Sequence, residues 1–258
     1  MATGRTVSKW LRVYVGGYDL SGYSRNIGPL AQVYDAVGEP AATDAIKGYL
    51  PNHVTLGLGT LNGIFDNTAT SGLHELHSAG AGARHVVTAA LGVRAAPAQG
   101  DAVYCGEFEQ KEYIADPNSG MVFATLPFAP TSEAAATLAY DRPWGVLLLP
   151  ATAQTAVNTA TGVDDNGAAT AFGGYMGYHI LAGNGTATLK VQDAATNLDA
   201  SFSDLSGATT GSLTMTAGLS GIVALGKTAT VRQFLRWQLV FGTGTTLTAF
   251  LSFSRALR

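Results

Sequence analysis

Short runs in which apolar and polar residues alternate recur along the whole chain. In the run HVTLGLGTLNGIF, residues 53–65, the apolar Val54, Leu56 and Leu58 alternate with small or polar residues. A period of two places such apolar side chains on one face of a β-strand. Further candidate strands bounded by Gly, Pro or polar turns occupy residues 83–95, 100–115, 120–129, 143–151, 174–183, 185–194, 211–218, 232–242 and 245–255. Turn signals at such short intervals favour β-sandwiches or barrels.

One segment departs from this pattern and predicts a helix. Within DNTATSGLHELHSAG, Leu73 and Leu76 are three residues apart after polar candidate caps, and glycines follow. We predict a short helix over about residues 70–79 that lays one apolar stripe on a sheet. His74 and His77 are also three apart and could share a helix face. No further ligand lies nearby at suggestive spacing, so we predict solvated surface histidines rather than a metal site.

The segment from Pro150 to Gly174 consists mostly of small, polar and turn-forming residues. Such a composition is typical of a linker or of a loop that opens a second domain. We therefore place a domain boundary near Pro150. Residues 1–150 and 151–258 then each contain about the number of strands that a β-sandwich needs. The predicted fold is all-β, with two β-sandwich-like domains, the first carrying one short flanking helix.

The composition differs from that of an ordinary soluble domain and indicates a protein whose surface is largely buried against other molecules. Of 258 residues, 47% are hydrophobic and only 13% are charged, about half the usual charged share. With 32 glycines, this favours self-assembly; a weakly charged soluble monomer is the alternative. The net charge of −3 argues against electrostatic capture of nucleic acid.

The single cysteine, Cys105, excludes an intrachain disulfide and a zinc site built from cysteines. We expect it to be a small buried residue rather than a reactive thiol. No apolar run of about 18 residues predicts a membrane span. No signal peptide is recognisable, so we expect synthesis and folding in a cytoplasm.

The most distinctive polar stretch is YCGEFEQKEY, in which Cys105, Glu107, Glu109 and Lys111 share one face of a predicted strand. Two glutamates suggest the acid pair of a glycosidase, but that chemistry needs carboxylates that face each other across a bond. Side chains two positions apart on one strand point the same way, about 7 Å apart. An acidic strip that faces solvent or a channel is the better interpretation.

Other candidate motifs favour structural roles. VDDNG, residues 163–167, lacks the spacing and distal Glu of a calcium loop and predicts a polar turn. No phosphate loop and no G-x-S-x-G elbow is present. In VRQFLRWQLVF, alternation places Trp237 in a sandwich core and the arginines outside, with sugar or base stacking as the alternative. We predict no enzyme activity, no catalytic residues, no cofactor and no metal.

The order of motifs in the first 150 residues resembles the tail tube proteins of long-tailed bacteriophages. A first strand ends in the turn GYDLS, residues 17–21; a loop rich in small and acidic residues leads to Lys47, Tyr49 and Pro51; and a long alternating strand ends in G-x-F-D, residues 63–66. The stretch from Ala95 to Phe128 is similar to the middle of these proteins. The second half resembles β-sandwich domains found in several virion components, an addition that the simplest tube subunits lack.

The resemblance implies a subunit that closes into rings, six to a ring, which stack into the conduit for the genome. The loop over about residues 26–50 would bridge to a neighbouring subunit or to the next ring. The implied assembly interface includes Tyr18, Tyr23, Tyr34, Lys47 and Tyr49. Glu107 and Glu109 would line the lumen, so that DNA passes without specific binding.

The implied partners are therefore copies of the chain itself, other virion proteins and passing DNA. The implied location is the virion tail, after assembly in the host cytoplasm. Two alternatives remain open: a capsid-decorating or other tail-associated β-sandwich protein, and a carbohydrate-binding module or glycan hydrolase that uses Trp237 or the two glutamates.

Overall fold

The fold is built from β-strands, as the alternating pattern predicted. The computed structural model describes residues 6–39, 48–93, 95–117, 120–130, 143–155, 162–165 and 167–256. Within these ranges the only α-helix is α1 (Leu73–His77), inside the predicted span of 70–79, and the 3-10 turns cover Ser8–Trp10 and Asp199–Ser201. The all-β prediction is confirmed.

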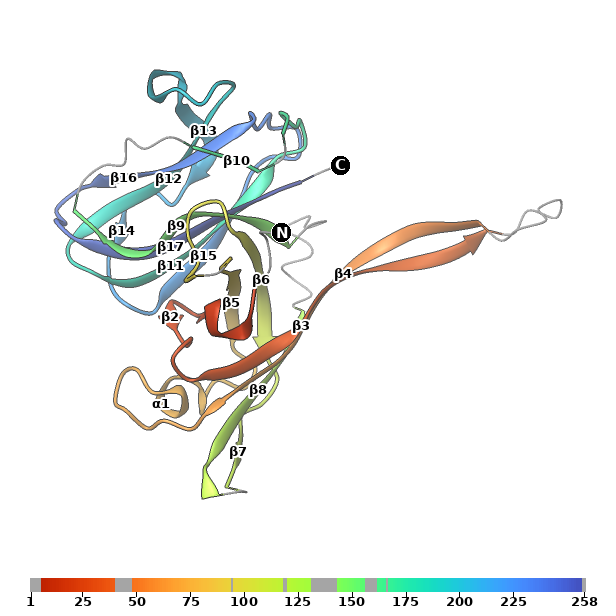
Figure 1. The fold of residues 1–258 in the computed structure, drawn as a ribbon, viewed down its shortest axis with the longest axis vertical. Helices are drawn as coiled ribbons and strands as arrows, with labels where there is room; N and C mark the ends of the chain where they lie inside the picture. Colours follow the sequence, from red (N-terminus) through yellow and green to blue (C-terminus); the bar gives the residue numbers. More distant parts are fainter. Residues whose placement is uncertain are drawn as a thin grey trace.

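The larger sheet runs through the middle of the molecule (Figure 1). All its neighbouring strands are antiparallel, in the order β15-β11-β17-β9-β6-β5-β1-β2. In chain order, these strands are β1 (Leu11–Val15), β2 (Tyr18–Asp19), β5 (Arg84–Leu91), β6 (Ala102–Gln110), β9 (Trp144–Gln154), β11 (Gly174–Gly183), β15 (Leu219–Ala224) and β17 (Leu247–Arg255). We call them the central sheet.

A branch leaves the central sheet at β6, whose last residues pair with β8. The branch consists of β3 (Ser24–Glu39), β4 (Gly48–Ile64), β7 (Ile114–Asp116) and β8 (Phe123–Pro130). A separate five-stranded sheet contains β10 (Val163–Asp164), β12 (Thr186–Ala194), β13 (Ser203–Thr209), β14 (Leu213–Thr214) and β16 (Phe234–Phe241).

Two sandwich cores lie on the outer faces of the central sheet. On the side of β1, β5 and β6, residues such as Val87, Tyr104 and Phe108 pack against β4, β8 and helix α1. On the side of β9, β11 and β17, residues such as Leu149 and Leu251 pack against the five-stranded sheet. Trp237 belongs to this second core and is 7% exposed, which confirms its predicted place.

A third core lies between the two halves of the central sheet. Its buried members are Tyr14, Val86, Ala90, Val103, Cys105, Leu147 and Phe250. The central strands are therefore buried on both faces, which explains why β5 and β17 are almost continuously apolar or small in sequence. Cys105 is buried here, as predicted, and burial raises the pKa of its thiol.

The two ends of the central sheet meet at a seam. The Gly218 N–H donates to the Gly17 carbonyl at 3.3 Å, and the Gly17 N–H donates to Nδ1 of His179 at 3.2 Å. Gly17 has a φ of +89°, and a Cβ on it would lie 2.5 Å from the backbone of Gly218. Only glycine satisfies both conditions at this position. The seam joins the first turn of the chain to strands near its other end.

The seam also fixes the protonation of His179, which is completely buried. A backbone N–H can only donate, so Nδ1 of His179 is the acceptor and the ring proton is on Nε2. That proton reaches Oγ1 of Thr88, 2.8 Å away, and the Thr88 hydroxyl donates in turn to Sγ of Cys105. Burial lowers the pKa of His179 to about 3. The ring is therefore neutral in the folded protein at ordinary pH.

An ion pair buried at the end of β17 was missed in the sequence, where residues 163–167 predicted only a polar turn. Arg255 contacts Asp165 at 2.6 Å, and both side chains are almost fully buried. The same guanidinium donates to the carbonyls of Val231 and Arg232 at 2.7 and 2.8 Å. Because its donors are satisfied, the buried charge is tolerated. These contacts hold the end of β17 against Asp165 and residues 231–233.

Three predictions need correction. Residues 26–50 were predicted as a loop, but 24–39 and 48–64 are strands, and 40–47 lie outside the described residues. His77, the last residue of α1, is not a solvated surface histidine, because it is 2% exposed and its ring contacts the Gln110 side chain. Arg236 does not lie outside the sandwich: it is buried over the ring of Phe202, 4.3 Å from the ring centre.

The predicted boundary near Pro150 falls inside β9, which pairs with β6 on one side and β17 on the other. The central sheet is therefore continuous across this position. The division into domains 1–150 and 151–258 stays a prediction about folding units.

The buried His179 predicts acid sensitivity. Its pKa is lower in the folded than in the unfolded chain, so the unfolded chain takes up a proton first as the pH falls below about 6.5. The free energy of unfolding should drop by about 2 kcal/mol between pH 6.5 and 5 from this group alone. Urea denaturation across this range should show a shallower pH dependence in His179→Gln than in the wild type or in His74→Gln. Equal slopes in all three would contradict this role.

Candidate assembly surface

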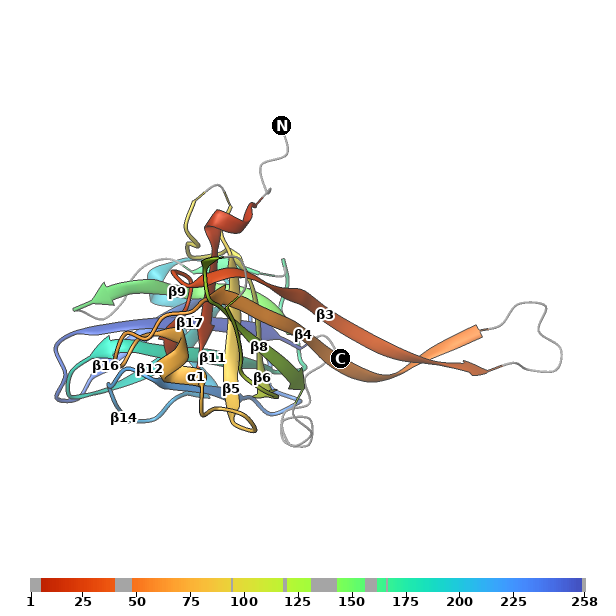
Figure 2. The same cartoon turned by 90° about the horizontal axis from the view of Figure 1, so that it is seen from below.

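Strands β3 and β4 form a long antiparallel hairpin that projects from the body of the molecule (Figures 1 and 2). Their register runs from Ser24 opposite Gly63 to Glu39 opposite Gly48, with bulges near Asn26 and Ala36. The segment predicted to be an assembly loop is thus mostly a two-stranded ribbon. Its small residues and its proline hid the alternation in the sequence.

The root of the hairpin is tied to the body at two places. Residues 60–64 of β4 pair with residues 123–127 of β8. The Tyr104 hydroxyl, at the end of a side chain rooted in the first sandwich core, lies 2.9 Å from the Ala31 carbonyl and 2.7 Å from the Gly57 carbonyl. One hydroxyl proton is therefore shared between the two strands of the hairpin. The contact sets where the hairpin leaves the body.

Close backbone approach at the root requires small residues. A Cβ on Gly59 would lie 1.8 Å from the Gly28 carbonyl oxygen, and one on Gly57 would lie 2.9 Å from Cβ of Ala31. The first obstacle is backbone, which cannot swing aside as a side chain can. The glycines of the run from 53 to 65 therefore have a packing function that alternation alone does not reveal.

Beyond the root, the hairpin leaves its backbone edges open within the described residues. β3 pairs only with β4, and residues 48–59 of β4 pair only with β3. A two-stranded ribbon is marginally stable by itself in water, and its free N–H and C=O groups are a template for another strand. Val33 on β3 is 49% exposed. The hairpin therefore has the properties of an element that is completed by a partner.

A group of exposed apolar side chains lies where β4 ends beside β7 and β8. Ile64 is opposite Phe123 on β8, and Ile114 is opposite Thr125. Val122 precedes β8, and its carbonyl accepts from the Phe65 N–H. The exposed members are Ile64, Ile114, Met121 and Val122, which we call the β7–β8 patch. Clustered apolar exposure of this kind is typical of interaction surfaces.

The turn from β2 into β3 is held by side-chain hydrogen bonds. The Ser21 N–H donates to Oδ1 of Asp19 at 2.9 Å, and the Val13 N–H donates to Oγ of Ser21 at 2.9 Å. Leu20, between them, is fully buried. The motif GYDLS therefore anchors the chain to β1 immediately before the hairpin begins.

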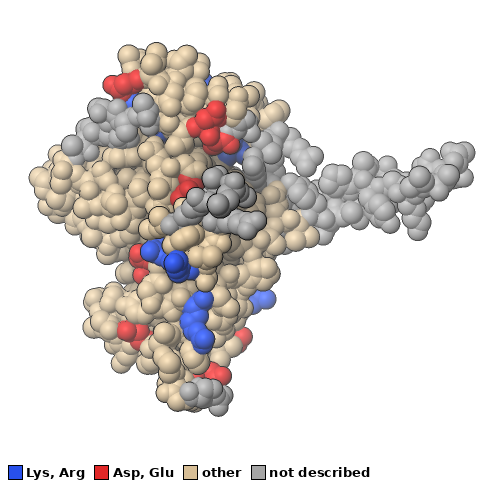
Figure 3. Space-filling model, viewed as in Figure 1, with Lys and Arg blue, Asp and Glu red and all other residues tan. Residues whose placement is uncertain are grey.

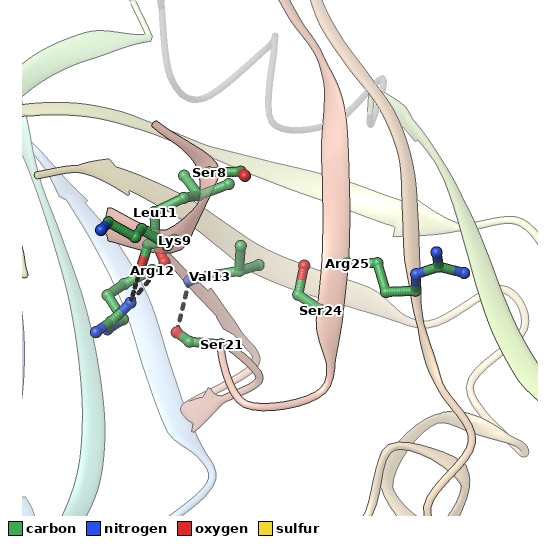
Figure 4. A pocket seen from close by; sticks show the side chains of 8 residues that line it. All are labelled: Ser8, Lys9, Leu11, Arg12, Val13, Ser21, Ser24 and Arg25. Carbon is green, nitrogen blue, oxygen red and sulfur yellow. Dashed lines mark hydrogen bonds between the residues drawn. The ribbon is translucent and has the colours of Figure 1, made fainter. Parts of the chain in front are cut away.

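A small polar cavity of about 120 Å³ lies beside this turn, lined by Lys9, Arg12, Ser21, Ser24 and Arg25 among others (Figure 4). Its cations do not converge: Arg12 donates to the carbonyls of Lys9 and Leu11, and Arg25 points away from the others (Figure 4). The cavity is therefore not an anion site. Figure 3 shows that most of this face of the molecule is uncharged.

The predicted acidic strip lies on β6, where Glu107 is half-buried and Glu109 is exposed. Their partners in the register are Val86 and Arg84 on β5. Arg84 is therefore opposite Glu109 in the register, so the strip is not uniformly negative. Its role in a lumen stays a prediction.

The tyrosines and the lysine of the predicted interface occupy different places. Tyr18 and Tyr23 are half-buried against the first sandwich core of their own chain. The backbones of Tyr34 and Tyr49 lie in β3 and β4, but their side chains and all of Lys47 lie outside the described part of the chain. The open edges and the Tyr104 contact were missed, because pairing partners are set by the tertiary fold.

Within the described residues, no three His, Cys, Asp or Glu side chains gather into a metal cluster. Among those residues, no helix has the length and apolar character needed to cross a membrane.

Comparison with known proteins leaves the family of the chain unassigned. No protein-family profile matches it, and no curated protein is significantly similar. Among solved structures, it is similar to the Dit protein of phage SPP1, described as a paradigm of the hub adsorption apparatus in phages that infect Gram-positive bacteria. The match covers 96% of this chain and 99% of that chain, with 12% sequence identity and a TM-score of 0.31. A TM-score this low does not establish a common fold.

The hairpin root predicts a glycine that cannot be replaced. Overpacking usually costs about 1–3 kcal/mol. Gly59→Ala should destabilise the root by an amount near the top of this range, because the new Cβ meets backbone atoms. Hydrogen exchange of β3 amides should accelerate while exchange in β17 is unchanged. Gly22→Ala is the matched control, since a Cβ there meets nothing within 4 Å. Unchanged exchange in Gly59→Ala would contradict the proposed packing.

Proposed function

We propose that this protein is a structural subunit of a bacteriophage tail that forms the tail tube by self-association into stacked rings of six. The observation that carries the proposal is the projecting β3–β4 hairpin with open edges on both strands beyond its root. The order of motifs in the first 150 residues supports the same assignment. The proposal places the protein in the virion tail, after assembly in the host cytoplasm.

The hairpin supports assembly because, among the described residues, no third strand pairs with its outer edges, and a neighbouring chain would supply one. β3 is 16 residues long and pairs on one side only within the described residues. Each backbone hydrogen bond gained from a neighbour contributes about 0.5–1.5 kcal/mol net. A ladder of several such bonds in every copy of a ring offsets the cost of ordering the ribbon. Closed rings leave no open edge, so growth stops at a defined size.

The surface chemistry supports contact with protein rather than capture of nucleic acid. The chain carries a net charge of −3, and the face in Figure 3 is mostly uncharged. The β7–β8 patch adds apolar area at the base of the branch. A tube built from such subunits would let DNA pass without specific binding, and it would meet other virion proteins at its ends.

A second candidate is a tail-associated or capsid-decorating protein, which would use the same sandwich domains without stacked rings. The low-charge five-stranded sheet and its core suit either location. The carbohydrate-binding alternative loses its main residue, because Trp237 is in the second core and cannot stack on a sugar.

Negative-stain electron microscopy of the purified protein, as a function of concentration, tests the proposal. Tubes or six-membered rings are expected. Trimers would favour a decorating protein, and a monomer at high concentration would overturn self-assembly.

Val33→Asp tests whether assembly uses the hairpin. A charge on the exposed edge strand should raise the concentration needed for assembly at least tenfold, because the carboxylate loses water in the interface. Val240→Asp is the matched control, since Val240 is 41% exposed on the separate five-stranded sheet. Light scattering against concentration gives the readout. An equal rise of the assembly concentration in both variants would mean that assembly does not depend specifically on the hairpin.

Glu107→Lys combined with Glu109→Lys tests the lumen. If this strip lines the conduit, added cations should hold DNA phosphates and slow ejection from assembled particles. The rate should recover as salt is raised, because the contacts are ionic. Ejection kinetics that do not change would count against the lumen position while leaving the assembly proposal intact.

A further inference from the structure

Beside the seam lies a cavity of about 290 Å³ that the assembly proposal does not use. It lies between the end of helix α1, the start of β5 and the start of β15. Its lining includes Tyr18, Leu76, His77, Arg84, His85 and Ser220. The rings of His77 and His85 meet edge to face, with their centres 5.1 Å apart. Two histidines from different elements thus converge at one cavity.

The tautomer of His77 follows from its neighbour Gln110, which is completely buried. The Gln110 amide nitrogen donates to the His77 carbonyl at 2.9 Å, which turns Oε1 toward the His77 ring. Oε1 only accepts, so Nδ1 of His77, 3.1 Å away, is the protonated nitrogen. Nε2 of His77 therefore carries a lone pair. It is buried and has no hydrogen-bond partner.

His85 has the same kind of unpartnered atom. Its Nε2 is buried and has no hydrogen-bond partner. Two ring nitrogens, one from each of these adjacent imidazoles, are thus left without partners.

Burial favours the neutral form of both rings, because no carboxylate is among the described residues that line this cavity. Two buried ring nitrogens without hydrogen-bond partners destabilise the fold. Such orphaned groups in a native fold call for a ligand or an ordered solvent molecule.

We propose that His77 and His85 bind a late first-row divalent metal ion such as Zn²⁺ through their Nε2 atoms. A neutral imidazole that donates its other N–H to a carbonyl oxygen is the usual form of a metal-bound histidine. Imidazole nitrogen suits Zn²⁺, Ni²⁺ and Cu²⁺ and does not suit Mg²⁺. Water molecules would complete the coordination of a bound ion, and Tyr18 and Ser220 also line the cavity.

The chemistry of the cavity limits the affinity. Only two protein nitrogens are supplied, and Arg84 adds a positive charge to the lining. We therefore expect a dissociation constant in the micromolar range. The ion would tie α1 to β5 next to the seam, so binding should stabilise the fold. At a hundredfold excess over the dissociation constant, the melting temperature should rise by about 5–10 °C.

Isothermal titration of the untagged full-length protein with ZnCl₂ tests the site, with MgCl₂ as the comparison ion. One Zn²⁺ per chain is expected. His77→Gln and His85→Gln should each weaken binding at least tenfold. His74→Gln is the matched control: His74 lies on the same helix and contacts Tyr113 at 3.2 Å outside this cavity. Absence of Zn²⁺ binding in the wild type, or equal binding in all the variants, would overturn the proposal.

A measurement on the wild type keeps the proposal falsifiable if a histidine variant fails to fold. X-ray absorption of the Zn²⁺-loaded protein should show two imidazole ligands in the first coordination sphere. The spectrum of the Cu²⁺-loaded protein, by electron paramagnetic resonance, should show coupling to two nitrogens. One imidazole or none would overturn the assignment, whatever the affinity.

Discussion

The rest of this structure depends on closing the ends of the central sheet against each other. At the seam, the Gly17 N–H has only the Nδ1 atom of His179 to receive it, and the Gly17 carbonyl accepts from Gly218. If either bond were missing, buried backbone groups would be left without partners at a cost comparable to a large share of the stability of a domain. Both sandwich cores use strands of this sheet, so the seam sets the positions of both. The polar chain through Thr88 specifies one arrangement, since any slip would leave a buried donor or acceptor unpaired.

The hairpin contrasts with the seam, because its strand edges are not covered by another strand among the described residues. Inside the body the chain uses a glycine, a histidine and a threonine to satisfy the seam, yet along β3 it leaves a row of backbone groups open among the described residues. Proteins that stay monomeric usually shorten, charge or cover such edges. Here the exposed strand carries Val33 rather than a lysine, and the root is held rigidly by Tyr104 and Gly59. In the proposed assembly, a rigidly attached open edge would favour pairing with a copy of the chain over random aggregation, because the body fixes the direction of the edge.

Periodicity predicted the strands and the helix well because it reports which faces are buried. Leu73 and Trp237 both lie where helical spacing or alternation put them. It failed over residues 26–50, because Gly28, Pro29 and Ala31 interrupt the pattern while backbone pairing, which has no sequence period, makes the strand. It also failed for His77 and Arg236. Whether a polar side chain is exposed depends on partners far away in sequence, here Gln110 and Phe202. The interface residues named from the sequence stay a prediction, and the open edges of the hairpin follow from topology alone.

The buried polar groups are concentrated where sequence-distant segments meet, and this distribution has a physical reason. Apolar packing tolerates small shifts between layers, whereas the hydrogen bonds of His179, Gln110 and the Arg255–Asp165 pair do not. A chain with few surface charges has little electrostatic repulsion to discourage wrong associations. The packing of its body is therefore determined by buried polar contacts that only one arrangement of the layers satisfies. The hairpin is the only long strand pair, among the described residues, with unpaired edges on both strands beyond its root. Under the proposed function, folding and assembly are separated: buried polar bonds determine the structure of the subunit, and the open backbone edges of the hairpin would determine the contact between subunits.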